Sequence, residues 1–312
     1  MAELELLRSL PFEAADPSEE ARSRAKGRLL RHIRRAPGRR RRRLLLPAVG
    51  LATAGAIAAL VGVGNHGGAD AAAARVLRKV ATVARTQPAE KPLERGHFRY
   101  TKSLVAYMSG GKGWNALSPG VREIWLGANG AGRLHERWGR PTFPSAADRA
   151  GWIAAGRPQV NPREDSGNLP PSPRVKLPTD PDVLYAKLHD RAVGSGNGTG
   201  PEMFTLVGDA LRESDASPAL RASLYEVAAR IPGVELVGPA TDRVGRHGVA
   251  VAYVDGKIHE RHELIFDPRT AALLGEEYVE LEGNSYGYSP GTVTGYATYV
   301  VSAAVNRLGA RP

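Results

Sequence analysis

The sequence predicts an α+β fold, with a mainly antiparallel sheet and inserted helices, preceded by one transmembrane helix and a short cytoplasmic helical segment. Three observations support this: an uncharged apolar run, short strand patterns joined by tight turns, and proline-capped helix patterns between the strands. Short turns connect antiparallel strands and cannot form parallel crossovers, so an antiparallel sheet follows. The expected segments are a cytoplasmic part, a span, a helix with a connector, and an extracytoplasmic domain, at residues 1–43, 44–64, 65–96 and 97–312.

Composition limits the chemistry that the chain can perform. It has 312 residues, a formal net charge of +11 and no cysteine. A disulfide scaffold, an iron–sulfur cluster and a thiol nucleophile are therefore excluded, whereas a cytosolic chain and an exported one remain equally compatible with the composition.

The apolar run at residues 44–64 is long enough to cross a bilayer. It contains no ionisable group over 21 residues, which at about 1.5 Å per residue extends roughly 30 Å as a helix. Pro47 lies near its start, where a missing helical N–H costs least. A buried core helix is the alternative, but soluble helices rarely stay uncharged for so long. A membrane span is therefore favoured.

Positive charge on one flank of this run sets its orientation. Residues 1–43 carry thirteen Lys or Arg against six Asp or Glu, a net of +7, and end in five consecutive arginines. The other flank has no basic residue before Arg75. Because Lys and Arg stay on the cytoplasmic side, the N-terminus is expected inside the cell membrane and residues 65–312 outside. The topology determinants are Arg39, Arg40, Arg41, Arg42 and Arg43.

Two alternatives concern the same segment. Ala69-Asp70-Ala71 looks like a signal-peptide cleavage site, but the segment before the run and the run itself are both long for a signal peptide, so a retained anchor is favoured. The arginines could form a nucleic-acid patch. Because they adjoin a span, a topology signal that also touches anionic lipid of the bilayer is favoured, and no direct nucleic-acid binding is expected.

The cytoplasmic part contains a helix pattern from about Pro17 to Arg35. Asp16 can cap it, and apolar residues recur every four positions at Ala21, Ala25, Leu29 and Ile33. This stripe is too narrow to stabilise an isolated helix, so the helix either binds a partner or lies on the membrane. The candidate partner-binding residues are Ala25, Leu29 and Ile33.

The extracytoplasmic part begins with an alanine-rich helix, expected at residues 69–85, and a proline-containing connector. Strand patterns follow at residues 97–107, 121–126 and 133–138, and Asn129-Gly130 between the last two indicates a hairpin. Residues 156–178 are rich in proline, glycine and polar residues and are expected to form a surface loop.

Three helices should then interrupt the strands, because each begins with a proline preceded by a capping residue. They begin near Asp180, Gly200 and Ser217, and the last carries an apolar stripe through Leu224 and Ile231. The remaining strands, joined by ordinary turns, are expected at residues 234–238, 248–254, 259–267, 271–281 and 292–305.

Several weak chemical signals have simpler structural explanations. Residues 194–200 are glycine-rich but lack the Lys-Ser/Thr ending of a phosphate loop, so a linker is favoured. His259 and His262 lie three apart on a predicted strand and point to opposite faces, which favours solvated histidines over a metal site. Eight aromatic residues either line an apolar ligand pocket or, as is commoner, belong to the core. They are Trp114, Trp125, Trp138, Trp152, Tyr286, Tyr288, Tyr296 and Tyr299. The sequence therefore predicts no catalytic residue, no metal, no cofactor and no enzyme.

Six short stretches carry a resemblance to a known family. The chain resembles actinobacterial single-pass membrane proteins of uncharacterised function, often encoded beside extracytoplasmic-function sigma factors. Its extracytoplasmic part also looks like the half-barrel folds of periplasmic lipoprotein carriers and of regulatory domains bound to anti-sigma factors. It departs from many anti-sigma domains because, without cysteine, it cannot hold their zinc-binding His/Cys pattern. The stretches are 4–8, 122–126, 177–181, 211–214, 231–234 and 263–268.

Two functions follow as hypotheses. The favoured one is a membrane-anchored envelope protein with a non-enzymatic external sensor or binding domain, whose internal helix contacts a cytoplasmic regulator such as a sigma factor. The alternative is a carrier of apolar ligands such as lipids on a simple anchor. A continuous apolar cavity in the external sheet would indicate the carrier, and a partner for the cytoplasmic helix would indicate the regulator.

Overall fold

The computed structural model describes residues 69–171, 176–212 and 216–312. The predicted cytoplasmic helix and the predicted span at 44–64 therefore lie outside the described residues. Among the helices of these ranges, none is both long and apolar enough to cross a membrane. The described helices are α3 (Ala71–Thr86), α4 (Ala146–Ala154), α5 (Pro181–Ala192), α6 (Thr199–Leu211) and α7 (Pro218–Ala228).

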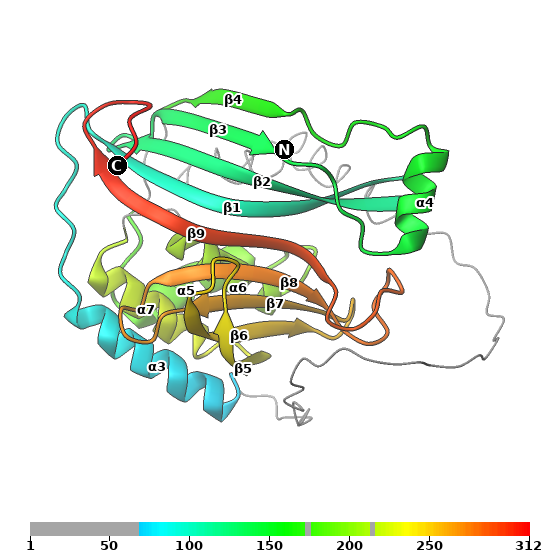
Figure 1. The fold of residues 1–312 in the computed structure, drawn as a ribbon. Coiled ribbons are helices and arrows are strands. Elements are labelled where there is room, and N and C mark those ends of the chain that lie inside the picture. Colours follow the sequence, from blue (N-terminus) through cyan, green and yellow to red (C-terminus); the bar gives the residue numbers. More distant parts are fainter. Residues whose placement is uncertain (1–68, 172–175, 213–215) are drawn as a thin grey trace. The chain divides into compact units, whose positions relative to one another are not determined.

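The described strands form one nine-stranded antiparallel sheet in the order β4-β3-β2-β1-β9-β8-β7-β6-β5 (Figure 1). Two meanders build it, one before the inserted helices and one after them, and pairing of β1 with β9 joins them. This arrangement confirms the predicted α+β class. The strands are β1 (Phe98–Gly111), β2 (Trp114–Gly127), β3 (Gly132–Trp138), β4 (Glu164–Leu169), β5 (Val234–Thr241), β6 (His247–Asp255), β7 (Glu260–Phe266), β8 (Leu273–Glu280) and β9 (Val293–Val305).

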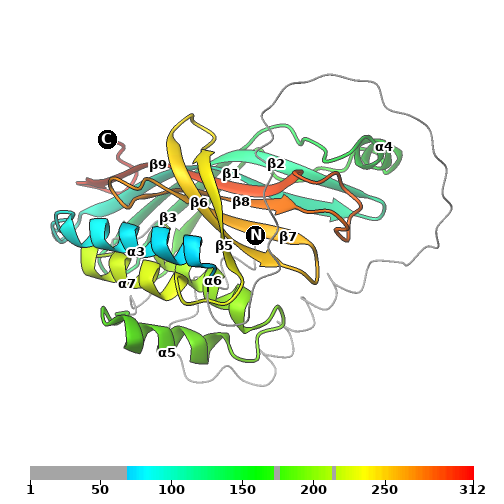
Figure 2. The same cartoon turned by 90° about the horizontal axis from the view of Figure 1, so that it is seen from below.

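A layer of helices covers one side of the β5–β8 half of the sheet. Figure 2 shows α3, α5, α6 and α7 together beneath these strands. Their buried faces join the strands in one apolar core that includes Leu77, Phe204, Leu224, Leu264 and Phe266. Burial of apolar side chains on this scale is the main favourable contribution to folding.

Local sequence signals located α3, α5, α6, α7 and the hairpin correctly. Asp180 caps α5 by accepting hydrogen bonds from the backbone N–H groups of Asp182 and Val183, and Ser217 caps α7. Each cap precedes a proline in the first turn, as the sequence indicated. The hairpin predicted around Asn129-Gly130 joins β2 to β3.

The expected surface loop at residues 156–178 is wrong in part, because it contains the edge strand β4. This strand reads Glu-Asp-Ser-Gly-Asn-Leu and has no apolar alternation, so its sequence lacks the usual strand signal. It is a strand because it pairs with β3.

A second difference lies at the other end of the same meander. The first two strands are longer than expected, and α4, which the sequence did not indicate, packs against their turn. A Cβ atom at Gly151 of α4 would lie 2.2 Å from the carbonyl oxygen of Gly113. The close approach of α4 to this turn therefore requires a glycine.

Aromatic residues do not gather in one pocket. Trp125 packs on Tyr100, with ring centroids 5.2 Å apart, while Trp138 packs on Tyr107 at 5.7 Å. These two pairs belong to separate clusters. Trp125 and Trp138 therefore belong to local cores, which was the favoured of the two interpretations, whereas Tyr286 is 49% exposed, contrary to it.

Candidate functional site

The helix-facing side of the sheet changes character from one half to the other. On the strands beneath the helices it is apolar, with Val251, Leu264 and Phe266 in the main core. From β8 to β3 the same side carries a row of polar side chains beside a small apolar cluster of Val105, Trp138 and Ala297. We define this polar band by Glu276 of β8, Tyr299 of β9, Ser103 of β1, Arg122 of β2 and Glu136 of β3.

Glu276 is the centre of the hydrogen-bond network at the helix end of this band. Arg212, the C-cap residue of α6, donates to its Oε2 at 2.9 Å, and the hydroxyl group of Tyr299 donates to Oε1 at 2.8 Å. His262 Nε2 lies 3.3 Å from Oε2. Glu276 is only 4% exposed, so these hydrogen-bond partners replace the water that its carboxylate loses on burial.

The electrostatics of this cluster favour a permanent ion pair. Burial by itself would raise the pKa of Glu276, but the positive charge of Arg212 and the hydrogen bonds from His262 and Tyr299 lower it to about 2. Burial by itself would lower the pKa of Arg212, but the negative charge of Glu276 raises that pKa above its usual value. General acid–base catalysis needs a pKa near the working pH, so Glu276 is suited to fixing structure and not to moving protons.

His262 contradicts its sequence-based interpretation as a solvated strand histidine. It is 8% exposed, its ring stacks on Tyr278 at 4.4 Å, and the edge of Phe204 from α6 meets it at 5.3 Å. The sequence could not show this, because α6 covers this face of β7 only in the folded protein. His259, the other histidine, lies in a turn with a φ of 55°.

The band continues across β9, β1, β2 and β3, away from the layer formed by the described helices α3, α5, α6 and α7 (Figure 1). Tyr299 is paired with Ser103, Ser103 with Arg122, and Arg122 with Glu136 in the strand register. Directly paired residues point to the same face. Arg122 lies 3.4 Å from Glu136, with side chains 5% and 3% exposed, and it also donates to the hydroxyl group of Tyr107 at 3.2 Å. The result is a second buried ion pair on this face.

The opposite face of β1–β3 carries a separate charged cluster around Glu123. Arg311 donates to its two oxygens at 2.6 and 2.8 Å, the hydroxyl group of Tyr100 donates at 2.7 Å, and His135 Nδ1 lies at 3.2 Å. Hydrogen bonding from Arg311, above all, lowers the pKa of Glu123 to about 2. Since Arg311 follows β9, this cluster fastens the last residues of the chain to the sheet.

Metal-binding side chains and cavities are the features that could hold a small ligand. Within the described ranges, no group of three or more acidic or histidine side chains could hold a metal ion. One cavity of about 580 Å³ lies where α3 begins and α7 ends, and another of about 490 Å³ lies beside the final residues. Neither is enclosed between the helix layer and the sheet.

The site residues expected from the sequence cannot be compared with this geometry. The arginines 39–43 and the stripe Ala25, Leu29 and Ile33 lie outside the described residues. Sequence reasoning missed the polar band, although one signal was present: Glu276 lies in a predicted strand that also contains Leu273, Leu274 and Val279. An acidic residue at an expected core position is a reason to look for a buried partner.

Comparison with known proteins gives only distant similarities. No family model matches the sequence, and no curated protein matches it. Among solved structures, MucB of Pseudomonas aeruginosa in complex with MucA is 14% identical, with a TM-score of 0.27, over 78% of this chain and 59% of that chain. MucB alone gives 14% identity and a TM-score of 0.29 over 78% of this chain and 61% of that chain.

A third similar structure belongs to a DUF1329 family protein from Desulfovibrio piger. It is 10% identical, with a TM-score of 0.20, over 76% of this chain and 92% of that chain. The present chain spans about three fifths of the length of the MucB chains. At these identities and TM-scores the similarities carry no conclusion about function.

Proposed function

We propose that this chain is a membrane-anchored envelope protein whose external domain is a non-enzymatic binding or sensing module. In this proposal residues 44–64 span the membrane, the arginines 39–43 hold the N-terminus inside, and the stripe Ala25, Leu29 and Ile33 docks into a cytoplasmic regulator such as a sigma factor. The resemblance of the sequence to membrane proteins encoded beside sigma factors supports the choice of regulator.

The polar band is the observation that carries this proposal over the carrier hypothesis. A carrier of apolar ligands needs a continuous apolar cavity to remove its cargo from water. On the described sheet, the apolar half is filled by helices, and the other half presents the ion pair of Arg122 with Glu136. An apolar cluster of Val105, Trp138 and Ala297 lies on the same face, but the buried charges beside it are poor lining for a lipid chain, so recognition of a protein surface fits this domain better.

The first experiment separates the two hypotheses through bound lipid. A protease site placed within residues 65–68 of the full chain would release residues 69–312 from the membrane after purification. Native mass spectrometry of the released part should show the mass of the polypeptide alone. One lipid bound per chain, retained through washing, would instead support the carrier.

The second experiment tests the cytoplasmic partner. The full chain and its Leu29→Asp/Ile33→Asp variant would be cross-linked in cells and purified in parallel. One identified regulator recovered with the first and not with the second supports docking of the stripe, because each buried anchor contributes about 2 kcal/mol or more. Charge reversal at Arg22, Lys26 and Arg31 is the matched control, since it alters contact with anionic lipid and leaves the apolar stripe intact.

A further inference from the structure

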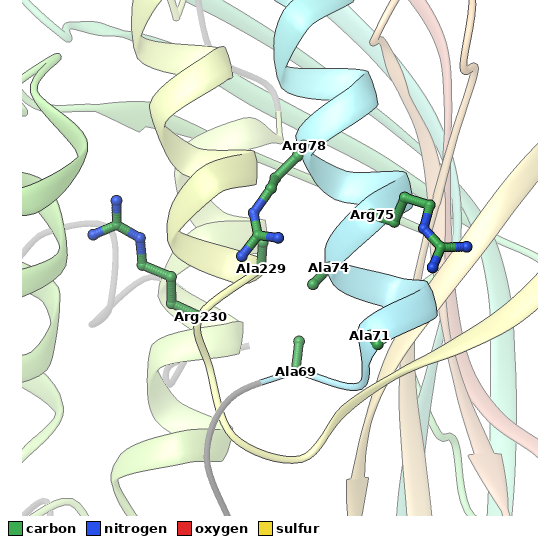
Figure 3. Close-up of a pocket in the computed structure, with 7 residues that line it drawn as sticks. All are labelled: Ala69, Ala71, Ala74, Arg75, Arg78, Ala229 and Arg230. Carbon is green, nitrogen blue, oxygen red and sulfur yellow. The ribbon is translucent and has the colours of Figure 1, made fainter.

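The cleft between the start of α3 and the end of α7 is lined by positive charge. It measures about 580 Å³ and is formed by Arg75, Arg78, Arg230 and four alanines. In Figure 3 the guanidinium group of Arg78 lies over the gap between the two helices, with Arg75 and Arg230 on either side of it. The alanine side chains are too short to fill the gap, so it remains open. We call this feature the arginine cleft.

The packing of α3 explains why these charges face solvent. Leu77, Val80 and Ala84 are buried against the rest of the domain, and the helical period then leaves Arg75, Arg78 and Lys79 exposed. The sequence of α3 contains no acidic residue. Its Arg85 is paired with Glu226 of α7, whereas no ion pair is recorded for Arg75, Arg78 or Lys79 in the described structure.

The acidic groups near the cleft are mostly engaged elsewhere. Asp70 accepts hydrogen bonds from the backbone N–H groups of Ala72, Ala73 and Leu236 at 2.6, 2.9 and 2.8 Å. Asp182, which is 81% exposed, pairs with Arg230 at 2.5 Å. Glu235 lies near Asp70, and burial together with the charge of Asp70 raises its pKa. Since no ion pair joins Arg75 or Arg78 to a described acidic residue, the α3 side of the cleft carries positive charge.

The position of the cleft in the chain indicates the anion that it meets. The predicted span ends at Gly64, and Asp70 caps α3 six residues later. An extended chain of that length reaches at most about 20 Å. With residues 44–64 in the membrane as proposed, a tether of this length allows the arginines to approach the membrane surface, where the field of anionic lipid headgroups decays within a Debye length of about 10 Å.

We propose that the arginine cleft docks α3 onto the anionic surface of the membrane leaflet from which the predicted span emerges. Lipid phosphates would pair with Arg75 and Arg78, because a guanidinium group forms charge-assisted hydrogen bonds with phosphate. Docking would hold the external domain in one orientation on the membrane. This inference rests on the proposed anchor, and it assigns to the domain a membrane contact separate from the span.

A distance measurement on the full chain tests this docking. The natural sequence has no cysteine, so Thr82→Cys on the exposed side of α3 gives a single site for a fluorescent donor. The labelled chain would be reconstituted in vesicles that contain an acceptor-labelled lipid, either with about 30% phosphatidylglycerol or with phosphatidylcholine alone. Energy transfer should be about twofold greater in the anionic vesicles and should fall to the neutral level in high salt.

The variants are chosen so that folding and net charge are controlled. Arg75→Glu/Arg78→Glu should reduce the anionic-vesicle signal to the neutral level, and Arg75→Gln/Arg78→Gln should have a smaller effect. Lys112→Glu/Arg140→Glu changes net charge equally, at exposed positions away from α3, and should leave energy transfer unchanged. Melting curves would verify that all variants are folded.

Two different failures are distinguishable. Equal energy transfer in both lipid compositions, or an unaltered signal in Arg75→Glu/Arg78→Glu, would overturn the docking and leave the anchor intact. Recovery of the chain in the soluble fraction after alkaline extraction of the vesicles would contradict the anchor, and the docking would be wrong with it.

Discussion

The two halves of the sheet use the same face in opposite ways. Beneath the helices, side chains such as Val251 and Leu264 are buried in an apolar core. Across β9 and β1–β3, and at Glu276 of β8, that face carries buried charged groups such as Arg122 and Glu136, beside a small apolar cluster around Val105. The first arrangement gains stability from removing apolar area from water. In the second, desolvation of the charges consumes much of what their attraction contributes.

This difference indicates what each half does. An apolar core tolerates exchange of one hydrophobic residue for another of similar volume, so it specifies little beyond a fold. A buried ion pair is sensitive to the loss of either partner. The polar band thereby defines the orientation of α6 over the sheet through Arg212 and Glu276. We expect substitutions in the two halves to differ in size and in pH dependence.

The largest effect is expected from a charge placed in the apolar half. Leu224 of α7 is fully buried, so Leu224→Asp should destabilise the external domain by about 4 kcal/mol or more and abolish cooperative folding. Circular dichroism melting of the detergent-solubilised full chain measures this loss. Ala219→Asp, at an exposed position in the first turn of the same helix, is the control and should melt as the wild type does. An unchanged melting curve for Leu224→Asp would show that α7 is not packed as described.

The next largest effect is expected in the polar band. Arg212→Met leaves the carboxylate of Glu276 buried without its cation, and we expect a loss of about 3–5 kcal/mol in the free energy of unfolding. Adding Glu276→Leu should restore most of that loss, because it removes the uncompensated charge. Urea titrations of the two single variants and the double variant measure the coupling. Simple additivity of the two single effects would contradict the ion pair.

A pH titration distinguishes carboxylates in the two halves. Burial, with Glu280 and Asp255 nearby, raises the pKa of Glu260 on β7 to about 7, above its value in the unfolded chain. The folded protein therefore loses stability as the pH rises from about 4.5 to about 7. Glu260→Gln should remove this loss of stability with rising pH. The variant should be more stable than the wild type at pH 8, by about 1–2 kcal/mol, and equally stable at pH 4.

The Glu276 carboxylate should produce the opposite slope. Its pKa of about 2 in the folded state is below the unfolded value, so its contribution is complete above about pH 4.5 and is lost as the pH falls toward 2. Chemical denaturation at pH 3, 4, 5, 6 and 8 would measure both pH dependences, the one from Glu276 at low pH and the one from Glu260 at higher pH. A wild-type protein whose stability rises steadily from pH 5 to pH 8 would contradict the assignment for Glu260.

The smallest effect is expected for a surface pair on the helix layer. Arg85 of α3 is paired with Glu226 of α7, and their side chains are 48% and 21% exposed. Arg85→Ala should cost no more than about 1 kcal/mol, and less in high salt, because water and ions screen the attraction. A loss as large as that of Arg212→Met would show that burial does not distinguish the two ion pairs.

Local sequence signals determined every described helix except α4, and several strands. The caps at Asp180 and Ser217 and the Asn129-Gly130 turn act over a few residues, so they are visible without a structure. The short turns after β6 and β7 likewise required antiparallel pairing, and the insertion of α5, α6 and α7 between two groups of strands followed from their order along the chain. The predicted span and its arginines are also properties of the sequence, and they remain a prediction.

Only the tertiary structure decided which distant residues meet. Pairing of β1 with β9 brings Ser103 beside Tyr299, and the end of α6 places Arg212 on Glu276. The edge strand β4 likewise exists through its neighbour β3. The physical reason is that burial and charge compensation depend on groups far apart in the chain, whereas caps and turns satisfy backbone groups within a few residues. For that reason the sequence could show Glu276 as an unusual core residue but could not name Arg212 as its partner.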